Sequence, residues 1–325
     1  MRIKHLIAAA IAVLMGAPIL TQHAIAQDDS IIFLAGPSSD PFWSAVQQGF
    51  DTAVKELGVT AQYSAPPDFN DIVPNYTKLF EAAIGRKPGA IVVGNFFPDP
   101  TEPLIRQAVA DGIAVVVYNS GRDSYRELGA ITFIGENPYL MGKRGGEKAA
   151  AAGVKKGICV NQIAANPVLE QRCQGYIDGV TEGGGTATMV TLPSEDIGND
   201  QKVISSIAAL LQADPAIDAV MTLGAAPGVN AVEAAKSFPD RKIFVGTLDL
   251  STPALELIKS GELAFTVDQQ PFLQGYYGVL IAHQFLKYGL VPAEPTTTGP
   301  LVIDQSNVDK VLAVSKDYPG SRGAS

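Results

Sequence analysis

The stretch "IIFLAGPSSDPFWSAVQQGF", residues 31–50, indicates the fold of the chain. Its first five residues are apolar without alternation, which is typical of a strand buried on both faces. After a short polar loop, Asp40 followed by a proline matches an N-cap with proline in the first helical position. Phe42 and Trp43, the single tryptophan, lie in the first turn of this predicted helix. Strand, loop and helix in this order form the repeating unit of a doubly wound α/β sheet.

The rest of the chain repeats this unit, because short β-branched runs alternate with longer helical patterns. Strands are expected at 31–35, 60–64, 90–94, 114–118, 131–135, 157–161, 187–191, 219–223, 243–247, 264–268 and 301–304. Helices are expected at positions that include 42–57, 70–85, 101–111, 138–152, 168–182, 199–212 and 272–288. The pattern predicts an α/β protein with parallel sheets covered by helices.

Two segments resemble each other and suggest that the chain has two similar lobes. "QGFDTAVKELG" at 48–58 and "QGYIDGVTEGG" at 174–184 share glutamine, glycine, an aromatic residue, valine, glutamate and the final glycine. Each follows a predicted strand and lies on the first long helix after it. Ligands bind beyond the carboxyl ends of the strands in open α/β sheets, so two facing lobes would form a ligand cleft.

The N-terminal residues 1–26 have the order of a secretory signal peptide. Arg2 and Lys4 form a basic start, an apolar run follows, and "AIA" at 24–26 is a small-x-small cleavage signal. A membrane anchor is the alternative, but the apolar run is shorter than the roughly 20 residues that a spanning helix needs. Because no cysteine stands at position 27, no lipid attachment is expected there. We therefore expect export to the periplasm and a mature chain that starts near Gln27.

Composition argues against several classes of function. The net charge is −9 and the basic residues form no cluster, which argues against nucleic acid and anionic membranes as partners. His283 is the only histidine outside the signal segment, and it lies in an amphipathic helical pattern. No GxSxG, P-loop or CxxC motif is present. We expect no metal, no cofactor and no catalytic residue.

The loops that follow the predicted strands combine polar planar side chains with aromatic rings. The candidate ligand-binding residues are Asp40, Phe42, Trp43, Asn119, Arg172, Asp249 and Gln269. Sugars and polyols require such a set, because their C–H faces stack on rings while their hydroxyls need donors and acceptors at the edge. Charged partners strengthen each of these hydrogen bonds.

Each candidate also has a purely structural interpretation. Asp40 matches a helix cap, and Trp43 fits the packed interior as well as it fits a binding wall. Asn119 fits a turn, Arg172 fits a surface ion pair, and Asp249 fits a cap for the next helix. Position along the chain does not separate these interpretations.

Cys159 and Cys173 are the only cysteines of the chain. In an oxidising compartment they are expected to form a disulfide, which would contribute roughly 3 kcal/mol by closing a short loop. Two buried reduced thiols are the alternative. A bridge would hold the start of the helix that carries Arg172.

Over its mature length the chain resembles the periplasmic sugar-binding proteins of the ribose-binding type, which serve ABC importers and have the type I periplasmic binding protein fold. The motifs that carry the resemblance are "SSDPFWSAVQQGF", "GENPYLMGKRGGEKAA", "RCQGYIDG", "AVMTLGAAPGVNAVEAA" and "FVGTLDLSTPALELIKSGELAFTVDQQPFLQG". The resemblance implies sugar contacts from Asp40, Phe42 and Trp43 in the first lobe, from Arg172 and Asp249 in the second, and from Gln269 at the hinge.

The chain departs from this family at two places that bear on the ligand. Ribose binders have Asp-Arg where this chain has Asn119-Ser120, and asparagine where it has Gly224. Both changes remove contacts to the sugar. Another pentose, a hexose or a polyol therefore fits as well as ribose.

The resemblance also implies three chain crossings that form a hinge, near Ile134-Gly135, Asp268-Gln269 and Glu294-Pro295. The expected division is 1–26 signal peptide, 27–134 plus 269–294 for lobe one, and 135–268 plus 295–325 for lobe two. Ligand held between two such lobes stabilises their closed state.

The function implied is that of a monomeric binding protein that delivers a sugar to an importer permease. A sugar sensor or chemoreceptor partner with the same fold is the alternative. A transcription repressor shares the two-lobe core, but the chain has a signal peptide and no basic helix-turn-helix segment. A secreted carbohydrate enzyme with Asp40 and Asp249 as paired carboxylates is a further alternative.

Overall fold

The computed structural model describes residues 29–163, 166–193, 196 and 198–322, and its elements form two lobes. The elements of the first lobe are β1 (Ile31–Leu34), α1 (Pro41–Leu57), β2 (Ala61–Ser64), α2 (Ile72–Gly85), β3 (Ala90–Val93), α3 (Pro98–Ala110), β4 (Ala114–Tyr118), β5 (Thr132–Gly135), α9 (Pro271–Tyr288) and β11 (Thr296–Thr297). The elements of the second lobe are α4 (Pro138–Ala151), β6 (Lys156–Asn161), α5 (Pro167–Glu182), β7 (Thr186–Thr191), α6 (Asp200–Ala213), β8 (Ala219–Thr222), α7 (Ala225–Lys236), β9 (Phe244–Leu248), α8 (Thr252–Ser260), β10 (Phe265–Asp268), β12 (Leu301–Asp304) and α10 (Val308–Asp317).

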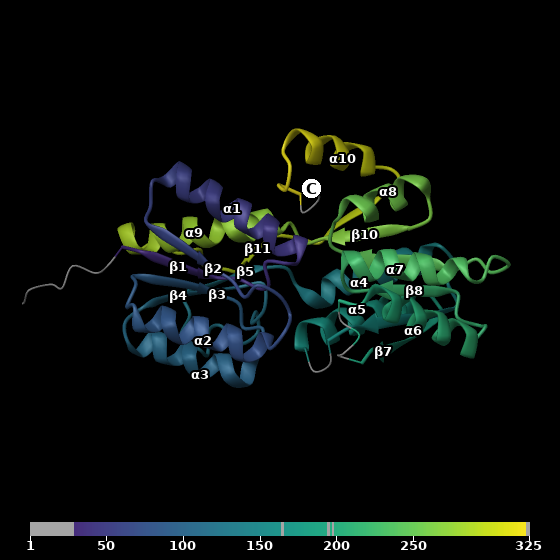
Figure 1. The fold of residues 1–325 in the computed structure, drawn as a ribbon, viewed down its shortest axis with the longest axis horizontal. Helices are drawn as coiled ribbons and strands as arrows, with labels where there is room; N and C mark the ends of the chain where they lie inside the picture. Colours follow the sequence, from purple (N-terminus) through teal and green to yellow (C-terminus); the bar gives the residue numbers. More distant parts are fainter. Residues whose placement is uncertain (1–28, 164–165, 194–195, 197, 323–325) are drawn as a thin grey trace, which may run out of the picture.

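Each lobe is built on one six-stranded sheet with helices on both faces, and the lobes lie side by side along the long axis of the molecule (Figure 1). The strand order is β11-β5-β4-β3-β1-β2 in the first sheet and β12-β10-β9-β8-β6-β7 in the second. Two similar α/β lobes with doubly wound sheets were expected from the sequence, and this fold class is confirmed.

The unbroken apolar run of β1 reflects burial on both of its faces. Phe33 packs in a core cluster with residues of α1 and α9, whereas Leu34 points to the opposite cluster with residues of α2 and α3. The second lobe repeats this arrangement, with α4 and α5 on one face of its sheet and α6, α7, α8 and α10 on the other. In each lobe, one hydrophobic core on each face of the sheet thus fixes the position of the strand ends that precede the candidate site residues.

The sheets differ from the expected parallel, fully buried form at their edges. Strand β12 pairs antiparallel with β10 because the chain returns from the first lobe by a direct connection rather than by a crossover helix. The edge strands β2 and β7 are partly exposed, since each has a neighbour on one side only. Within the part of the chain that the structure describes, no helix is long and apolar enough to span a membrane.

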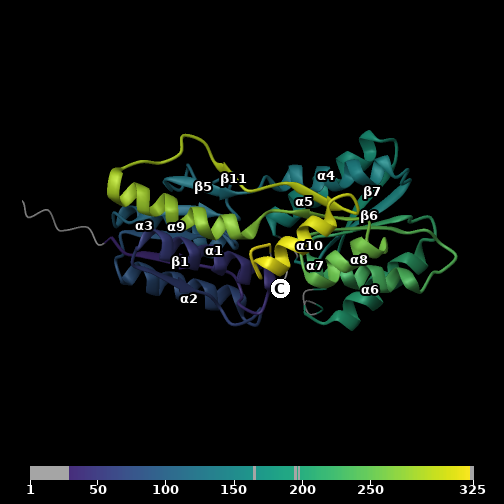
Figure 2. The ribbon, with the colours of Figure 1, turned by 90° about the horizontal axis from the view of Figure 1, so that it is seen from above.

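The chain passes between the lobes three times (Figure 2). The first passage lies between β5 and α4, and the second lies between β10 and α9. The third was expected at Glu294-Pro295, but Thr296–Thr297 still pairs with β5 in the first sheet. It therefore lies further along the chain, between β11 and β12, because this short strand extends the edge of the first sheet.

Candidate ligand-binding site

The first turn of α1 places Asp40, Phe42 and Trp43 at the carboxyl end of β1. Asp40 is the N-cap, and its carboxylate accepts a hydrogen bond of 3.0 Å from the backbone N–H of Phe42. Phe42 and Trp43 are only 8% and 9% exposed, and their rings meet edge to face at 4.8 Å between centroids. The cap interpretation of Asp40 is confirmed, and it is compatible with a second role at the site.

The indole of Trp43 belongs to an aromatic cluster at this end of the first sheet. Its ring lies 5.2 Å from Phe96 and 6.2 Å from Tyr118 between centroids. Gly36 leaves the space that the indole fills, because a Cβ at that position would lie 2.1 Å from the ring. Trp43 is therefore packed against the core, and its role as a stacking wall stays a prediction.

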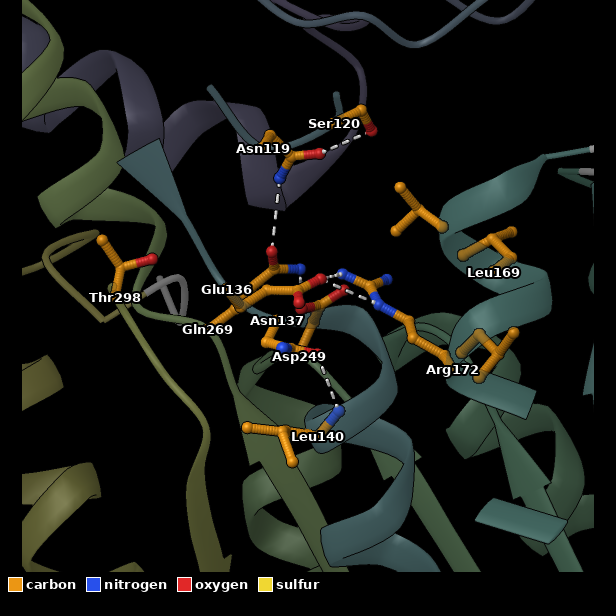
Figure 3. Close-up of polar contacts among 12 residues, drawn as sticks. Asn119, Ser120, Glu136, Asn137, Leu140, Leu169, Arg172, Asp249, Gln269 and Thr298 are labelled. Carbon is orange, nitrogen blue, oxygen red and sulfur yellow. Dashed lines mark hydrogen bonds and ion pairs between the residues drawn. The ribbon is translucent and has the colours of Figure 1, made fainter. Parts of the chain in front are cut away.

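Asn119 and Asp249 follow strands β4 and β9, and both have a left-handed backbone conformation, with φ of 59° and 63°. Asparagine and aspartate tolerate this conformation better than other side chains with a Cβ. The sharp turn directs each side chain toward the passage between the lobes, where the two lie near Gln269 (Figure 3). Asn119 is thus a turn residue whose side chain reaches the second passage, and its contact with a ligand stays a prediction.

Gln269, in the second passage, connects the two lobes by hydrogen bonds (Figure 3). Its side-chain oxygen accepts from the amide of Asn119 at 3.2 Å, and its own amide donates to the carboxylate of Asp249 at 2.7 Å. Gln274, fully buried near the start of α9, accepts from Asn119 at 3.0 Å and donates to the hydroxyl of Thr298 in the third passage at 3.2 Å. Gln274 was not among the predicted site residues, although it lies in the "DQQPFLQG" motif.

Arg172 is not the surface residue of the alternative interpretation, because it is 4% exposed and paired with Glu136. Its Nη2 and Nε groups donate to Oε1 of Glu136 at 2.6 and 3.2 Å. Glu136 lies in the first passage and is fully buried. Glu136 was not among the predicted site residues, although it directly follows the crossing expected near Ile134-Gly135.

Burial dominates the electrostatics of the three carboxylates. It raises the pKa of Asp40 to about 6, against the hydrogen bond from Phe42, and the carboxylate of Asp249 adds to the shift. Burial also raises the pKa of Asp249 and of Glu136, and in both cases Arg172 opposes the shift. Burial therefore outweighs the attraction of Arg172 at both Asp249 and Glu136.

Asp249 and Gln269 therefore meet Asn119 of the first lobe in one hydrogen-bonded network, and Arg172 is coupled to it through its electrostatic interaction with Asp249. Asp40 is coupled to this group through its electrostatic interaction with Asp249. The departure at Gly224 has no local explanation in the structure, because its backbone is extended and a Cβ built there would make only ordinary contacts, the nearest with the side-chain nitrogen of Gln162 at 3.5 Å. Among the residues that the structure describes, no group of three or more His, Cys, Asp or Glu side chains is arranged to hold a metal ion.

A hydrogen bond also joins the lobes beside Arg172. The amide of Gln171 on α5 donates to the carboxylate of Asp123, in the loop after β4, at 3.1 Å. Cys173 lies two residues after Gln171 on α5, and it forms a disulfide with Cys159 of β6. The expected bridge is therefore present, and it ties the start of α5 to the sheet beside Arg172.

Comparisons with known proteins agree with this geometry. Residues 31–290 match the family model described as a periplasmic binding protein domain. The xylose/arabinose-binding protein of Sulfolobus acidocaldarius is 27% identical over 90% of this chain and 75% of its own length. The D-apiose import binding protein of Actinobacillus succinogenes is 24% identical over 87% of this chain and 91% of its own length.

A solved structure supports the same assignment. The carbohydrate transporter of Acidothermus cellulolyticus 11B, in complex with myo-inositol, is 32% identical and superposes with a TM-score of 0.78. The match covers 90% of this chain and 98% of that protein. The family model, the identity and the two-lobe fold lead to one conclusion. The chain belongs to the periplasmic binding protein family, as the sugar-binding motifs predicted.

Proposed function

We propose that this protein captures a monosaccharide or cyclic polyol between its lobes and delivers it to an ABC importer. The observation that carries the proposal is the polar network Asn119–Gln269–Asp249, which joins both lobes through the hinge beside Arg172. Such a network exchanges hydrogen bonds with hydroxyl groups, and the aromatic surface of Phe42 and Trp43 faces the apolar side of a ring. The relatives whose names state pentoses and the relative bound to myo-inositol support this ligand class.

The protein acts in this proposal as a monomeric, non-enzymatic carrier. Residues 1–26 are removed as a signal peptide on export to the periplasm, and the partner of the closed form is the membrane permease. We assign no acid–base role to Asp40 and Asp249, because one is a helix cap and the other is engaged by Gln269. Light scattering during gel filtration and mass spectrometry of the exported protein test the monomer and the cleavage.

Fluorescence of Trp43 tests ligand binding directly, because the chain has no other tryptophan. The exported protein is unfolded and refolded to remove retained ligand, and is then titrated with xylose, arabinose, apiose, ribose, glucose, galactose and myo-inositol. We expect a saturable change at micromolar concentration with one group of these sugars and a matching rise in Tm. A flat fluorescence response with unchanged Tm across the set would contradict the proposal.

A further inference from the structure

Glu136 is a buried acidic residue whose role the proposed function leaves open. It is fully buried in the first passage between the lobes, and one of its two oxygens receives both hydrogen bonds from Arg172. Among the described residues no donor reaches the other oxygen, Oε2. An isolated buried carboxylate oxygen is costly, so this atom requires a hydrogen-bond donor in the functional state of the site.

The charges around Glu136 come from both lobes. Arg172 of α5 and Arg122, in the loop after β4, attract it, whereas Asp249 repels it. Asp40 of the first lobe is in turn repelled by Asp249. The positive charge of Arg172 is thus already balanced by Glu136. With Arg122 included, two arginines face the three carboxylates of Glu136, Asp249 and Asp40, so an excess of negative charge remains toward a ligand.

We propose that Glu136 is a specificity-determining residue: by neutralising Arg172 and offering Oε2 to a hydroxyl group, it makes the site select neutral sugars or polyols and reject sugar acids and sugar phosphates. This inference rests on the proposed function and adds the charge class of the ligand. An unpaired arginine between two lobes would attract a carboxylate or a phosphate. With Glu136 in place, the charge of Arg172 is already compensated, and the two further carboxylates repel an anionic ligand. A hydroxyl group, in contrast, can donate to the carboxylate oxygens.

Binding of matched neutral and anionic ligands tests the proposal. The probes are D-glucose with D-glucuronate, D-galactose with D-galacturonate, and myo-inositol with myo-inositol 1-phosphate, titrated against Trp43 fluorescence and by calorimetry. For the wild type we expect the neutral member of at least one pair to bind about 100-fold more tightly than the anionic member. A wild type that binds an anionic probe as tightly as its neutral counterpart would overturn the inference without any variant.

The variant Glu136→Gln keeps the size of the side chain and removes its charge. We expect weaker binding of the neutral probe and stronger binding of the anionic one, so that the preference falls to roughly tenfold or less. Glu136→Asp keeps the charge and should keep the preference, although both affinities fall. The control is Glu147→Gln, because Glu147 pairs with Arg144 on the exposed surface of α4 and should leave both affinities unchanged.

The outcomes separate this inference from the proposed function. No binding of any of these probes, nor of the pentoses in the fluorescence titration above, contradicts the proposed function itself. Binding of neutral probes with an unchanged preference in Glu136→Gln overturns only the role of Glu136. Should Glu136→Gln fail to fold, Arg172→Gln applies the opposite change, and a gain in affinity for anionic probes in that variant would overturn the inference.

Discussion

Asp40 combines a structural role with a place among the candidate ligand-binding residues. Its carboxylate caps α1, yet burial raises its pKa to about 6. A raised pKa means that the folded protein holds this proton more tightly than the unfolded chain does. The resulting stabilisation is complete below the ordinary pKa of aspartate and is lost as the pH rises through about 6.

The variant Asp40→Asn tests this pH dependence, because asparagine caps a helix as well as aspartate does. Between pH 5 and pH 7.5, the free energy of unfolding of the wild type should fall by about 1 kcal/mol relative to that of the variant. Urea unfolding at the two pH values measures the difference. Parallel changes in both proteins would show that Asp40 keeps an ordinary pKa.

At the residue scale, the sequence allowed the polar candidates to be identified but not their partners. Asn119, Asp249 and Gln269 were predicted from their positions after strands, and the fold brings them together because the carboxyl ends of β4 in the first sheet and of β9 and β10 in the second meet where the lobes join. Glu136 was missed as the partner of Arg172, since a contact between residues far apart in the chain depends on how the first passage meets α5. No local spacing encodes that contact.

At the element scale, glycines explain why the two lobes resemble each other. Helix α5 packs against α4 so closely that a Cβ at Gly142 would lie 1.7 Å from the carbonyl oxygen of Arg172, and one at Gly175 would lie 2.0 Å from that of Tyr139. In the first lobe Gly49 and Gly275 make the same kind of contact between α1 and α9, each at 1.9 Å from a backbone oxygen. The repeated "QGF" and "QGY" segments therefore mark equivalent helix contacts.

Gly142→Ala is expected to disturb stability and binding together. The new methyl group forces α4 and α5 apart at the backbone of Arg172, which should cost about 1–3 kcal/mol of the free energy of unfolding and weaken ligand binding. Thermal unfolding and Trp43 titration measure the two effects. The control is Gly85→Ala, because no atom lies within 4 Å of a Cβ there. Equal stability of the two variants would contradict the close contact.

The order of helices and strands was largely predictable, because both sheets are buried and their strands have clear apolar patterns. Expected helices such as 42–57 and 272–288 match α1 and α9 within a residue. The direction of β12 was not predictable, since the same short apolar run fits either direction. The two-residue strand β11 has no pattern of its own, which is why the third passage was misplaced.

At the scale of the whole molecule, contacts on two sides hold the lobes in this arrangement. On one side the C-terminal segment lies between the lobes (Figure 2). Gly320 lies against the side chain of Gln48 on α1 of the first lobe, while Arg322 pairs at 2.6 Å with Asp268 at the end of β10 in the second lobe. On the other side the bond between Gln171 and Asp123 joins the lobes directly. Neither contact was predictable from the sequence, because each depends on the angle between two separately folded lobes.

The bond between Gln171 and Asp123 should act mainly on the release of the ligand. It exists only while the lobes are together, so its loss in Gln171→Ala destabilises the closed, ligand-bound form and leaves the encounter with the open form unchanged. One such hydrogen bond contributes about 0.5–1.5 kcal/mol, so the dissociation rate should rise roughly 2- to 10-fold while the association rate stays the same. Stopped-flow fluorescence of Trp43 separates the two rates.

Gln174→Ala is the matched control, because Gln174 lies on the same helix and donates to Asp178 within α5. A slower association with unchanged dissociation in Gln171→Ala would mean that this bond guides the encounter and does not hold the closed form.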